Sequence, residues 1–301
     1  MPGSGVDLQE CVRLALAEDL GSRELDLARD VTSSLSVSAG CRGRAVLVAK
    51  AAGVLAGLEC ALAAFRLLDG GCAIDVRRRD GEAFVPGDEL LVVAGTMRAL
   101  LAAERTALNF VQRLSGIATL TRAFVDAVRG TRARILDTRK TTPGLRHLEK
   151  AAVVAGGGHN HRIGLFDQVL LKENHFAAAR PAAVEEVVQR CVAGQGRPVV
   201  AEARTVAEAV RCVRGGAAIV LLDNFAAGEP LRAAVRAVRT TAAELGRDVE
   251  TEASGGIDLA TVRAFAECGV DRISVGALTH SAKAIDLSLL VEGAALVEEA
   301  G

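Results

Sequence analysis

The chain has 301 residues, of which 50% are apolar, and a formal net charge of −1 from 36 Lys and Arg against 37 Asp and Glu. This is the composition of a globular protein, and the balanced charge argues against a general nucleic-acid coat. No apolar run approaches the ~18 residues of a membrane span, and the first ten residues lack the basic and apolar regions of a secretory signal. The seven cysteines are odd in number and have no CxxC spacing, so we expect reduced thiols and a cytoplasmic protein.

The first hundred residues predict a helix followed by a small, mainly antiparallel sheet. Apolar residues recur at helical spacing over residues 6–20, and Gly21 ends the pattern. Strand-like runs and one further helix follow at 44–49 (strand), 54–68 (mostly helix), 72–79 (strand) and 88–94 (strand). Residues 97–129 then predict helix, interrupted near Ser115 and Gly116, and this segment should bridge two domains.

After Arg129, short apolar runs alternate with helical patterns. The strand-like runs are 133–137, 168–172, 198–203, 218–223, 249–254 and 272–275, and helical patterns between them include 182–192, 205–215 and 258–268. Repeated β-α units with apolar strands favour a parallel sheet covered by helices. Six or more units in this length suit a barrel shorter than the usual eight-fold form, with a doubly wound open sheet as the alternative.

Polar residues follow the apolar runs of this second half, where the strands are predicted to end. Lys172, Glu202 and Asp223 each close a run, and Thr138, Arg139 and Lys140 come just after another. Because the carboxyl ends of parallel strands meet on one face of a barrel, these side chains should converge on one site.

The charge near this site indicates an anionic ligand. Residues 131–175 contain eight Lys and Arg against four Asp and Glu. Fixed cations in a cleft suit a small, highly charged anion, and guanidinium groups match carboxylate and phosphate geometry. We interpret His161, beside Arg162, as a further donor to an anion, because its surroundings lack the other ligands of a zinc site. Four of these cations fit surface helix positions at least as well: Arg132, Arg134, Arg146 and Lys150.

Two glycine-containing segments suit phosphate. Ser254-Gly255-Gly256 and Val275-Gly276-Ala277 each follow a predicted strand, and glycine lets backbone N–H groups approach phosphate oxygens. Glu202 and Asp223 are acidic residues in this basic setting. A magnesium ion bridging them to a diphosphate, directly or through water, is one explanation; salt bridges to nearby cations are the other.

The stretch DTRKTTPGLRHLEKAAVVAGGGHNHRIGLFDQVLLKENH, residues 137–175, closely resembles the quinolinate phosphoribosyltransferases, also called carboxylating nicotinate-nucleotide pyrophosphorylases. The resemblance continues over nearly the whole chain, in KAAGVLAGLE (50–59), ERTALNFVQRLSGIAT (104–119), LLDNF (221–225), EASGGI (252–257) and residues 269–289. The chain departs from the family pattern at Ala151, where an aromatic residue is common, and at Val200, where a second glutamate is common.

The resemblance implies an N-terminal α/β sandwich domain (1–115, with the bridging helix), an incomplete, about seven-stranded α/β barrel (116–285) and a C-terminal tail (286–301). It implies a homodimer with shared active sites, and the magnesium-dependent reaction of quinolinate with phosphoribosyl diphosphate in NAD biosynthesis, giving nicotinate mononucleotide, carbon dioxide and diphosphate. Lys140, Lys172, Glu202 and Asp223 would be catalytic, the last two also near magnesium. The substrate-binding set would be these four with Arg105, Thr138, Arg139, His161, Arg162, Ser254, Gly255, Gly256, Val275, Gly276 and Ala277. We expect Arg105 to act in the neighbouring subunit's site.

Three other functions are compatible with the sequence. A molybdenum-transport-associated relative shares the barrel and several of the motifs. A Schiff-base aldolase is possible because Lys172 ends a barrel strand. A sensor on the same barrel would bind the substrates without releasing diphosphate.

Overall fold

The structure is a computed structural model that describes residues 7–296, and the chain packs into two compact units. Unit 1 contains the described residues up to Leu120, then Thr141–Gly157 and the described residues from Ser281. Unit 2 contains Thr121–Lys140 and Gly158–His280. Each unit is therefore assembled from segments that are separated along the chain.

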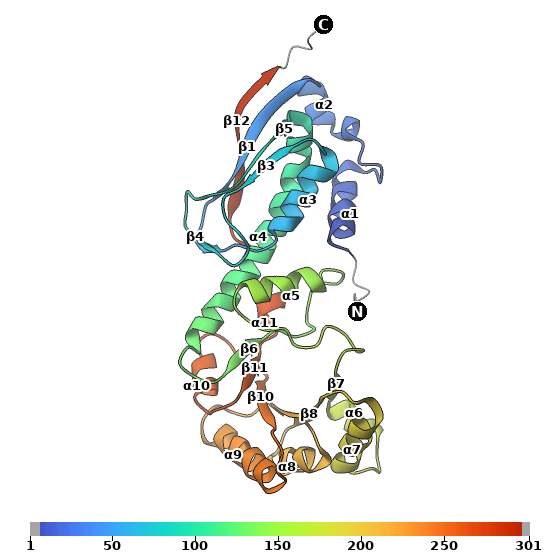
Figure 1. The fold of residues 1–301 in the computed structure, drawn as a ribbon, viewed down its shortest axis with the longest axis vertical. Helices are drawn as coiled ribbons and strands as arrows, with labels where there is room; N and C mark the ends of the chain where they lie inside the picture. The colour runs from blue at the N-terminus through green and yellow to red at the C-terminus, as the bar shows by residue number, and fades with distance from the viewer. Residues whose placement is uncertain (1–6, 297–301) are drawn as a thin grey trace. The chain divides into compact units, whose positions relative to one another are not determined.

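Unit 1 is built around a four-stranded antiparallel sheet with the strand order β12-β1-β5-β3 (Figure 1). Helices α1 and α3 pack on each other, and Gly21 ends α1 in the left-handed conformation that glycine adopts readily. The elements are α1 (Leu8–Leu20), η1 (Leu27–Arg29), α2 (Val31–Ser36), β1 (Cys41–Ala49), β2 (Gly53–Val54), α3 (Leu58–Leu68), β3 (Ala73–Val76), β4 (Ala83–Phe84), β5 (Glu89–Thr96), α4 (Met97–Ala127, to Leu120 in this unit), α5 (Arg146–Ala155) and β12 (Leu287–Leu296).

The segment expected as a C-terminal tail, 286–301, contains a strand of this sheet. Its described part forms β12, which pairs antiparallel with β1 so that Ala45 lies opposite Val291. The partner strand lies some 240 residues earlier in the sequence, so no local pattern reveals the pairing. Residues 297–301 lie outside the described residues.

Helix α4 runs without the break that we expected near Ser115 and Gly116. The Ser115 hydroxyl accepts a hydrogen bond from the N–H of Ala56 at 3.1 Å and donates one to its carbonyl oxygen at 3.3 Å. A Cβ on Gly116 would lie 2.0 Å from the carbonyl oxygen of Lys283. Glycine is thus required here by the close approach of another backbone, and the expectation of a helix break was wrong.

Unit 2 is a six-stranded parallel sheet with helices between its strands, in the order β6-β11-β10-β9-β8-β7 (Figure 1). Leu136 of β6 also forms an isolated parallel bridge with His159. The described residues thus form six strands in this sheet, where the resemblance implied about seven. The helix expected over 258–268 is shorter, at Val262–Ala266. The elements are β6 (Arg134–Leu136), β7 (Val169–Leu171), α6 (Glu173–Ala178), α7 (Val184–Gln195), β8 (Val199–Ala203), α8 (Val206–Gly215), β9 (Ile219–Asp223), α9 (Glu229–Glu244), β10 (Glu250–Ser254), α10 (Val262–Ala266), β11 (Arg272–Ser274) and α11 (Ala277–His280).

Two further features of the fold concern the cysteines and the length of the helices. All seven cysteines are unpaired, and burial raises the pKa of Cys60 and Cys212 to about 12. These two thiols therefore behave as small buried apolar side chains. Among residues 7–296, no helix combines the length and the apolar character that crossing a bilayer demands.

Candidate active site

A cavity of about 850 Å³ lies at the carboxyl ends of the parallel strands of unit 2. Taken across the sheet from β6 to β7, the strand ends bring to it Lys140, Gly276, Gly255, Asp223, Glu202 and Lys172 in turn. Except for Arg105, every predicted site residue lines this cavity: Thr138, Arg139, Lys140, His161, Arg162, Lys172, Glu202, Asp223, Ser254, Gly255, Gly256, Val275, Gly276 and Ala277. The convergence expected from the strand ends is therefore present.

Two arginines that line the cavity, Arg139 and Arg162, lie close enough for their charges to interact. Burial and the nearby charge of Arg139 lower the pKa of the Arg162 guanidinium, although Asp167 acts in the opposite direction. Arg162 donates to the carbonyl oxygen of Gln168 at 3.3 Å, whereas the buried Nη1 of Arg139 has no hydrogen-bond partner. Buried donors are normally paired. An anionic group between the two guanidiniums would satisfy that donor and relieve their repulsion.

The two lysines come from opposite edges of the sheet. Lys140 follows β6, and its carbonyl oxygen accepts a hydrogen bond from the hydroxyl of Thr279 at 2.8 Å. Its side chain passes close over Gly276, because a Cβ there would lie 3.0 Å from the Lys140 Cδ. Lys172 precedes α6, and its backbone N–H donates to Nδ1 of His175 at 3.0 Å. The backbones of Lys140 and Lys172 are thus each held by a hydrogen bond, and both lysines line the cavity.

Glu202 and Asp223 place two carboxylates at the ends of adjacent strands. Burial and the negative charge of Asp223 raise the pKa of Glu202, although Lys172 and Arg204 lower it in part. Sequence reasoning did not single out Arg204, which lies 2.7 Å from Glu173 and 4.0 Å from Asp223. Two mutually repelling carboxylates suit a cation, and Mg²⁺ commonly takes one or two protein carboxylates together with substrate phosphates. The described residues contain no group of three or more potential ligands that would make a metal site from protein alone.

We expect Glu202→Gln to remove activity and yet to raise the melting temperature near pH 8. Because the folded chain raises the pKa of Glu202, ionising this side chain opposes folding once the pH exceeds its ordinary pKa. Glutamine removes that charge, so the gain should be present at alkaline pH and should disappear below about pH 4. Thermal unfolding of both proteins at the two pH values measures it. A variant that melts lower than the parent near pH 8 would contradict the expectation.

Two glycine-containing segments, Ser254–Gly256 and Val275–Ala277, line the cavity with their backbone. Gly255 has φ +105°, and a Cβ there would lie 2.2 Å from Oδ1 of Asn224. Asn224 itself has φ +57°, donates from its backbone N–H to the carbonyl oxygen of Ser254 at 2.9 Å, and contacts Asp223 through its side-chain amide at 2.6 Å. The Ser254–Gly256 segment and Asp223 are therefore linked through Asn224. Asn224 was not among the predicted site residues, although it lies in the LLDNF segment (221–225) that resembles the family.

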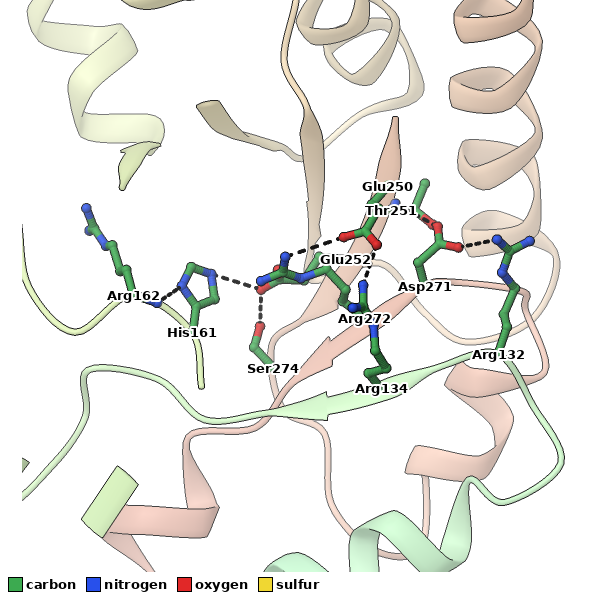
Figure 2. A network of polar contacts seen from close by, with 10 residues as sticks. All are labelled: Arg132, Arg134, His161, Arg162, Glu250, Thr251, Glu252, Asp271, Arg272 and Ser274. Atoms are coloured by element: carbon green, nitrogen blue, oxygen red, sulfur yellow. Dashed lines mark hydrogen bonds and ion pairs between the residues drawn. The ribbon is translucent and has the colours of Figure 1, made fainter. Parts of the chain in front are cut away.

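His161 lies at the buried end of the cavity, and its ring contacts differ from the expected role. Its Nδ1 accepts the backbone N–H of Arg162 at 2.7 Å, and its Nε2 lies 3.4 Å from Glu252 (Figure 2). Both ring nitrogens thus have protein partners, so the ring is not placed as the donor to an anion that we expected. Glu252, a polar residue at a predicted strand end, was not included among the predicted site residues, and Ser274 was missed; both line the cavity together with His175 and His280.

The remaining predicted cations lie elsewhere. Arg105 is an exposed residue of α4 in unit 1. Lys150, expected at the surface, is only 1% exposed, which corrects that interpretation. Arg132 and Arg134 are exposed residues of unit 2 that pair with Asp271 and Glu250. The cationic character of the cavity therefore rests on fewer residues than the charge count along the sequence implied.

Comparison with models of known protein families shows to which family the chain belongs. Residues 30–115 match the model of the quinolinate phosphoribosyl transferase N-terminal domain, and residues 117–290 match that of its C-terminal domain. The chain belongs to the quinolinate phosphoribosyl transferase family. Its resemblance to that family, first based on sequence motifs, is thus confirmed over most of its length.

Named members of the quinolinate phosphoribosyl transferase family align over almost their full length. A nicotinate-nucleotide pyrophosphorylase [carboxylating] of Mycobacterium leprae is 39% identical over 93% of this chain and 96% of its own. A probable enzyme of the same name from Bacillus subtilis is 37% identical, over 94% of this chain and 93% of its own. This family membership favours phosphoribosyl transfer over the Schiff-base aldolase that Lys172 had left open.

Solved structures of the quinolinate phosphoribosyl transferase family share the fold. The nicotinate-nucleotide pyrophosphorylase of Francisella tularensis superposes with a TM-score of 0.86 at 36% identity, covering 95% of this chain and 96% of that one. The protein of that name from Ehrlichia chaffeensis gives a TM-score of 0.85 at 30% identity, covering 95% and 99%. The expected fold class, a small N-terminal α/β domain followed by an incomplete α/β barrel, is thereby confirmed.

Proposed function

We propose that this chain transfers a phosphoribosyl group to quinolinate with decarboxylation, giving nicotinate mononucleotide, carbon dioxide and diphosphate. The names of its relatives given above, nicotinate-nucleotide pyrophosphorylase [carboxylating], describe this reaction. The observation that supports it most within the chain itself is the pair of arginines, one with an unpartnered buried Nη1, facing a cavity that also holds two lysines. A ligand with several negative charges is what such a site needs.

The two substrates fit different parts of the cavity, quinolinate the charged side chains and phosphoribosyl diphosphate the glycine-containing backbone segments. The carboxylates of quinolinate fit the guanidiniums of Arg139 and Arg162, since planar donors match planar carboxylates. The phosphates of phosphoribosyl diphosphate fit the backbone of the Ser254–Gly256 and Val275–Ala277 segments, where glycines leave room for close approach. Lys140 and Lys172, from opposite edges of the sheet, can then neutralise charge on both ligands.

Glu202 and Asp223 act at the reacting carbon of the ribose. As the C1–oxygen bond to diphosphate breaks, positive charge develops on the ribose, and the two carboxylates can stabilise it. We also assign them to magnesium, and their mutual repulsion, relieved by a cation, supports this. Bound there, the ion would neutralise charge on the leaving diphosphate.

Bond formation and decarboxylation follow from the position of the pyridine nitrogen. Its lone pair forms the bond to ribose C1 while diphosphate leaves with the electrons of the broken bond. The nitrogen then carries a positive charge next to the carbon that bears one carboxylate. That charge stabilises the electron pair left when the carbon–carboxylate bond breaks and carbon dioxide departs, and the carbon then takes up a proton. The chain supplies positioning and fixed charge.

The direct test of this proposal is to incubate the purified protein with quinolinate, phosphoribosyl diphosphate and magnesium and to look for nicotinate mononucleotide. Omission of each component in turn is the control. Formation of the nucleotide only in the complete mixture is the expected result. Binding of both substrates without product would instead identify a sensor on the same fold.

We expect quinolinate to be preferred over nicotinate by about 10² or more in kcat/KM, because nicotinate would leave a charged donor of the Arg139–Arg162 pair unpaired. Both compounds are offered under the same conditions, and mononucleotide formation is followed for each. Nicotinate lacks the carboxylate next to the ring nitrogen, so it also reports on whether that group is recognised. Comparable turnover of the two compounds would contradict the proposal for the arginine pair.

We further propose a cytoplasmic homodimer in which Arg105 acts in the neighbouring subunit's site. Unpaired cysteines throughout the chain support a reducing compartment. The exposed position of Arg105 on α4, and its absence from the cavity of unit 2, support a role between subunits.

Subunit mixing tests the role of Arg105. Inactive Arg105→Ala and inactive Lys172→Ala proteins, allowed to exchange subunits at a 1:1 ratio, should regain about a quarter of parental activity, since half of the dimers are mixed and each has one intact site. Differently tagged subunits verify the exchange. Complete exchange without recovered activity would mean that Arg105 works within its own subunit or not at all.

A further inference from the structure

A row of polar side chains lies along β10 and its neighbouring segments (Figure 2): His161, Glu252, Arg272, Glu250 and Arg134. Nε2 of His161 lies 3.4 Å from Oε1 of Glu252, and Oε2 of Glu252 lies 2.9 Å from Nε of Arg272. Arg272 in turn lies 3.4 Å from Glu250, which pairs with Arg134. Only the first members face the cavity, so the row connects the substrate site to the other end of the sheet.

Glu252 is a fully buried carboxylate whose charge is already balanced. Its side chain is 0% exposed, and burial by itself would raise its pKa. The contacts with His161, the positive charge of Arg272 and the hydrogen bond from Ser274 outweigh burial and lower the pKa of Glu252. The contact with Arg272 is an ion pair without hydrogen-bond geometry.

The hydrogen bonds of His161 therefore define which ring nitrogen carries the proton directed at Glu252. Its Nδ1 accepts the backbone N–H of Arg162 at 2.7 Å, and a nitrogen that accepts a hydrogen bond bears no proton. The proton is then on Nε2, directed at Glu252. The backbone N–H of His161 donates to Oδ1 of Asp137 at 2.9 Å, so the segment is fixed on both sides of the ring.

Arg162 depends on this arrangement. Its guanidinium lies close enough to Arg139 for the two charges to repel, and such a pair stays in place only if the backbone beneath it is fixed. We propose that Glu252 is a positioning residue for quinolinate. By accepting the Nε2 proton it selects the tautomer whose Nδ1 holds the backbone of Arg162, and it thereby sets the Arg162 guanidinium for one substrate carboxylate. This inference rests on the proposed function.

Glu252→Gln tests the inference, with Glu250→Gln as its matched control. The control makes the same change two residues away on the same strand, at a side chain that also contacts Arg272 but does not line the cavity. In Glu252→Gln, an amide oxygen directed at His161 and Ser274 would leave the NH₂ group facing the cationic Arg272. The opposite orientation would direct the NH₂ group at Nε2 of His161, which disfavours a proton there, so the tautomer of His161 is no longer selected. We expect the KM for quinolinate to rise about tenfold or more and that for phosphoribosyl diphosphate to change by less than about twofold. Glu250→Gln should leave both within about twofold.

Two kinetic outcomes would overturn the inference: an unchanged quinolinate KM in folded Glu252→Gln, or an equal rise in both KM values, which indicates general loosening. A parent protein that makes no nicotinate mononucleotide would instead refute the proposed function. A second measurement stands independently of activity and of the variant's folding. Nitrogen-15 NMR of the histidine-labelled parent, with His161 assigned through His161→Gln, should show a protonated Nε2 and an unprotonated Nδ1. A proton on Nδ1 in the free enzyme would overturn the inference.

Discussion

Lys140→Ala and Lys172→Ala are each expected to lower kcat/KM by about 10² or more, the scale of losing a charged contact made in the transition state. The two ammonium groups come from opposite edges of the sheet of unit 2, so neither can replace the other. Lys140→Arg should fail as well. The Lys140 stem passes close over Gly276, and a broad guanidinium at its end would displace the ligand.

Steady-state kinetics of the three variants measure this, with thermal unfolding to verify that each is folded. Lys50→Ala is the matched control, since Lys50 is an exposed lysine of unit 1 outside the cavity. It should retain parental kinetics. A folded Lys140→Ala or Lys172→Ala protein with near-normal turnover would remove that lysine from the site.

Gly255→Ala is expected to reduce turnover by about 10², because a shift of an ångström in a positioning group can have that effect. The positive φ of Gly255 disfavours alanine, and the added Cβ would lie 2.2 Å from the side chain of Asn224. Asn224 must then move, and it holds Asp223 through its amide and Ser254 through its backbone N–H. The change therefore disturbs a phosphate segment and a carboxylate together.

The control Gly130→Ala separates the two effects of Gly255→Ala, which are the unfavourable positive φ of alanine and the contact of its Cβ with Asn224. Gly130 also has a positive φ, but no atom lies within 4 Å of the position of its Cβ. This variant should lose about 1 kcal/mol of stability and keep its activity. Turnover in Gly255→Ala that matches Gly130→Ala would show that the contact with Asn224 does not matter for the reaction.

Most residues that line the cavity could be predicted from the sequence, because the carboxyl ends of the strands in a parallel sheet lie at the same edge. Lys172, Glu202 and Asp223 each close an apolar run, and the ends of parallel strands must meet. The substrates could also be predicted through the family resemblance, since the motifs around Arg139 and Arg162 are long and specific. What each of these residues does in the reaction stays a prediction.

The buried contacts beneath the cavity could not be predicted in the same way. Glu252 reads as one more polar residue near a strand end, yet its burial depends on β11 and on the segment that contains His161. Its partner Arg272 comes 20 residues later and looks like an ordinary strand start. Arg162, its neighbour in sequence, suggested that His161 donates to a bound anion, whereas in the structure its Nε2 lies 3.4 Å from the carboxylate of Glu252. A role of His161 toward the substrate stays a prediction.

Long-range backbone contacts account for the other differences. Gly116 suggests a helix break by its local propensity, but the carbonyl oxygen of Lys283 explains its presence. Strand β12 becomes a strand only by pairing with β1, far away in the sequence. Lys150 looks like a surface residue on an amphipathic helix, and its burial is decided by tertiary packing.

The measurement that tests the central claim most directly is the stoichiometry of the reaction with quinolinate labelled in the carboxylate next to the ring nitrogen. With phosphoribosyl diphosphate and magnesium, the proposed function predicts labelled carbon dioxide, diphosphate and unlabelled nicotinate mononucleotide in equal amounts, with none formed when phosphoribosyl diphosphate is omitted. Label retained in a nucleotide product, or carbon dioxide released without diphosphate, would contradict the coupling of phosphoribosyl transfer to decarboxylation in this cavity.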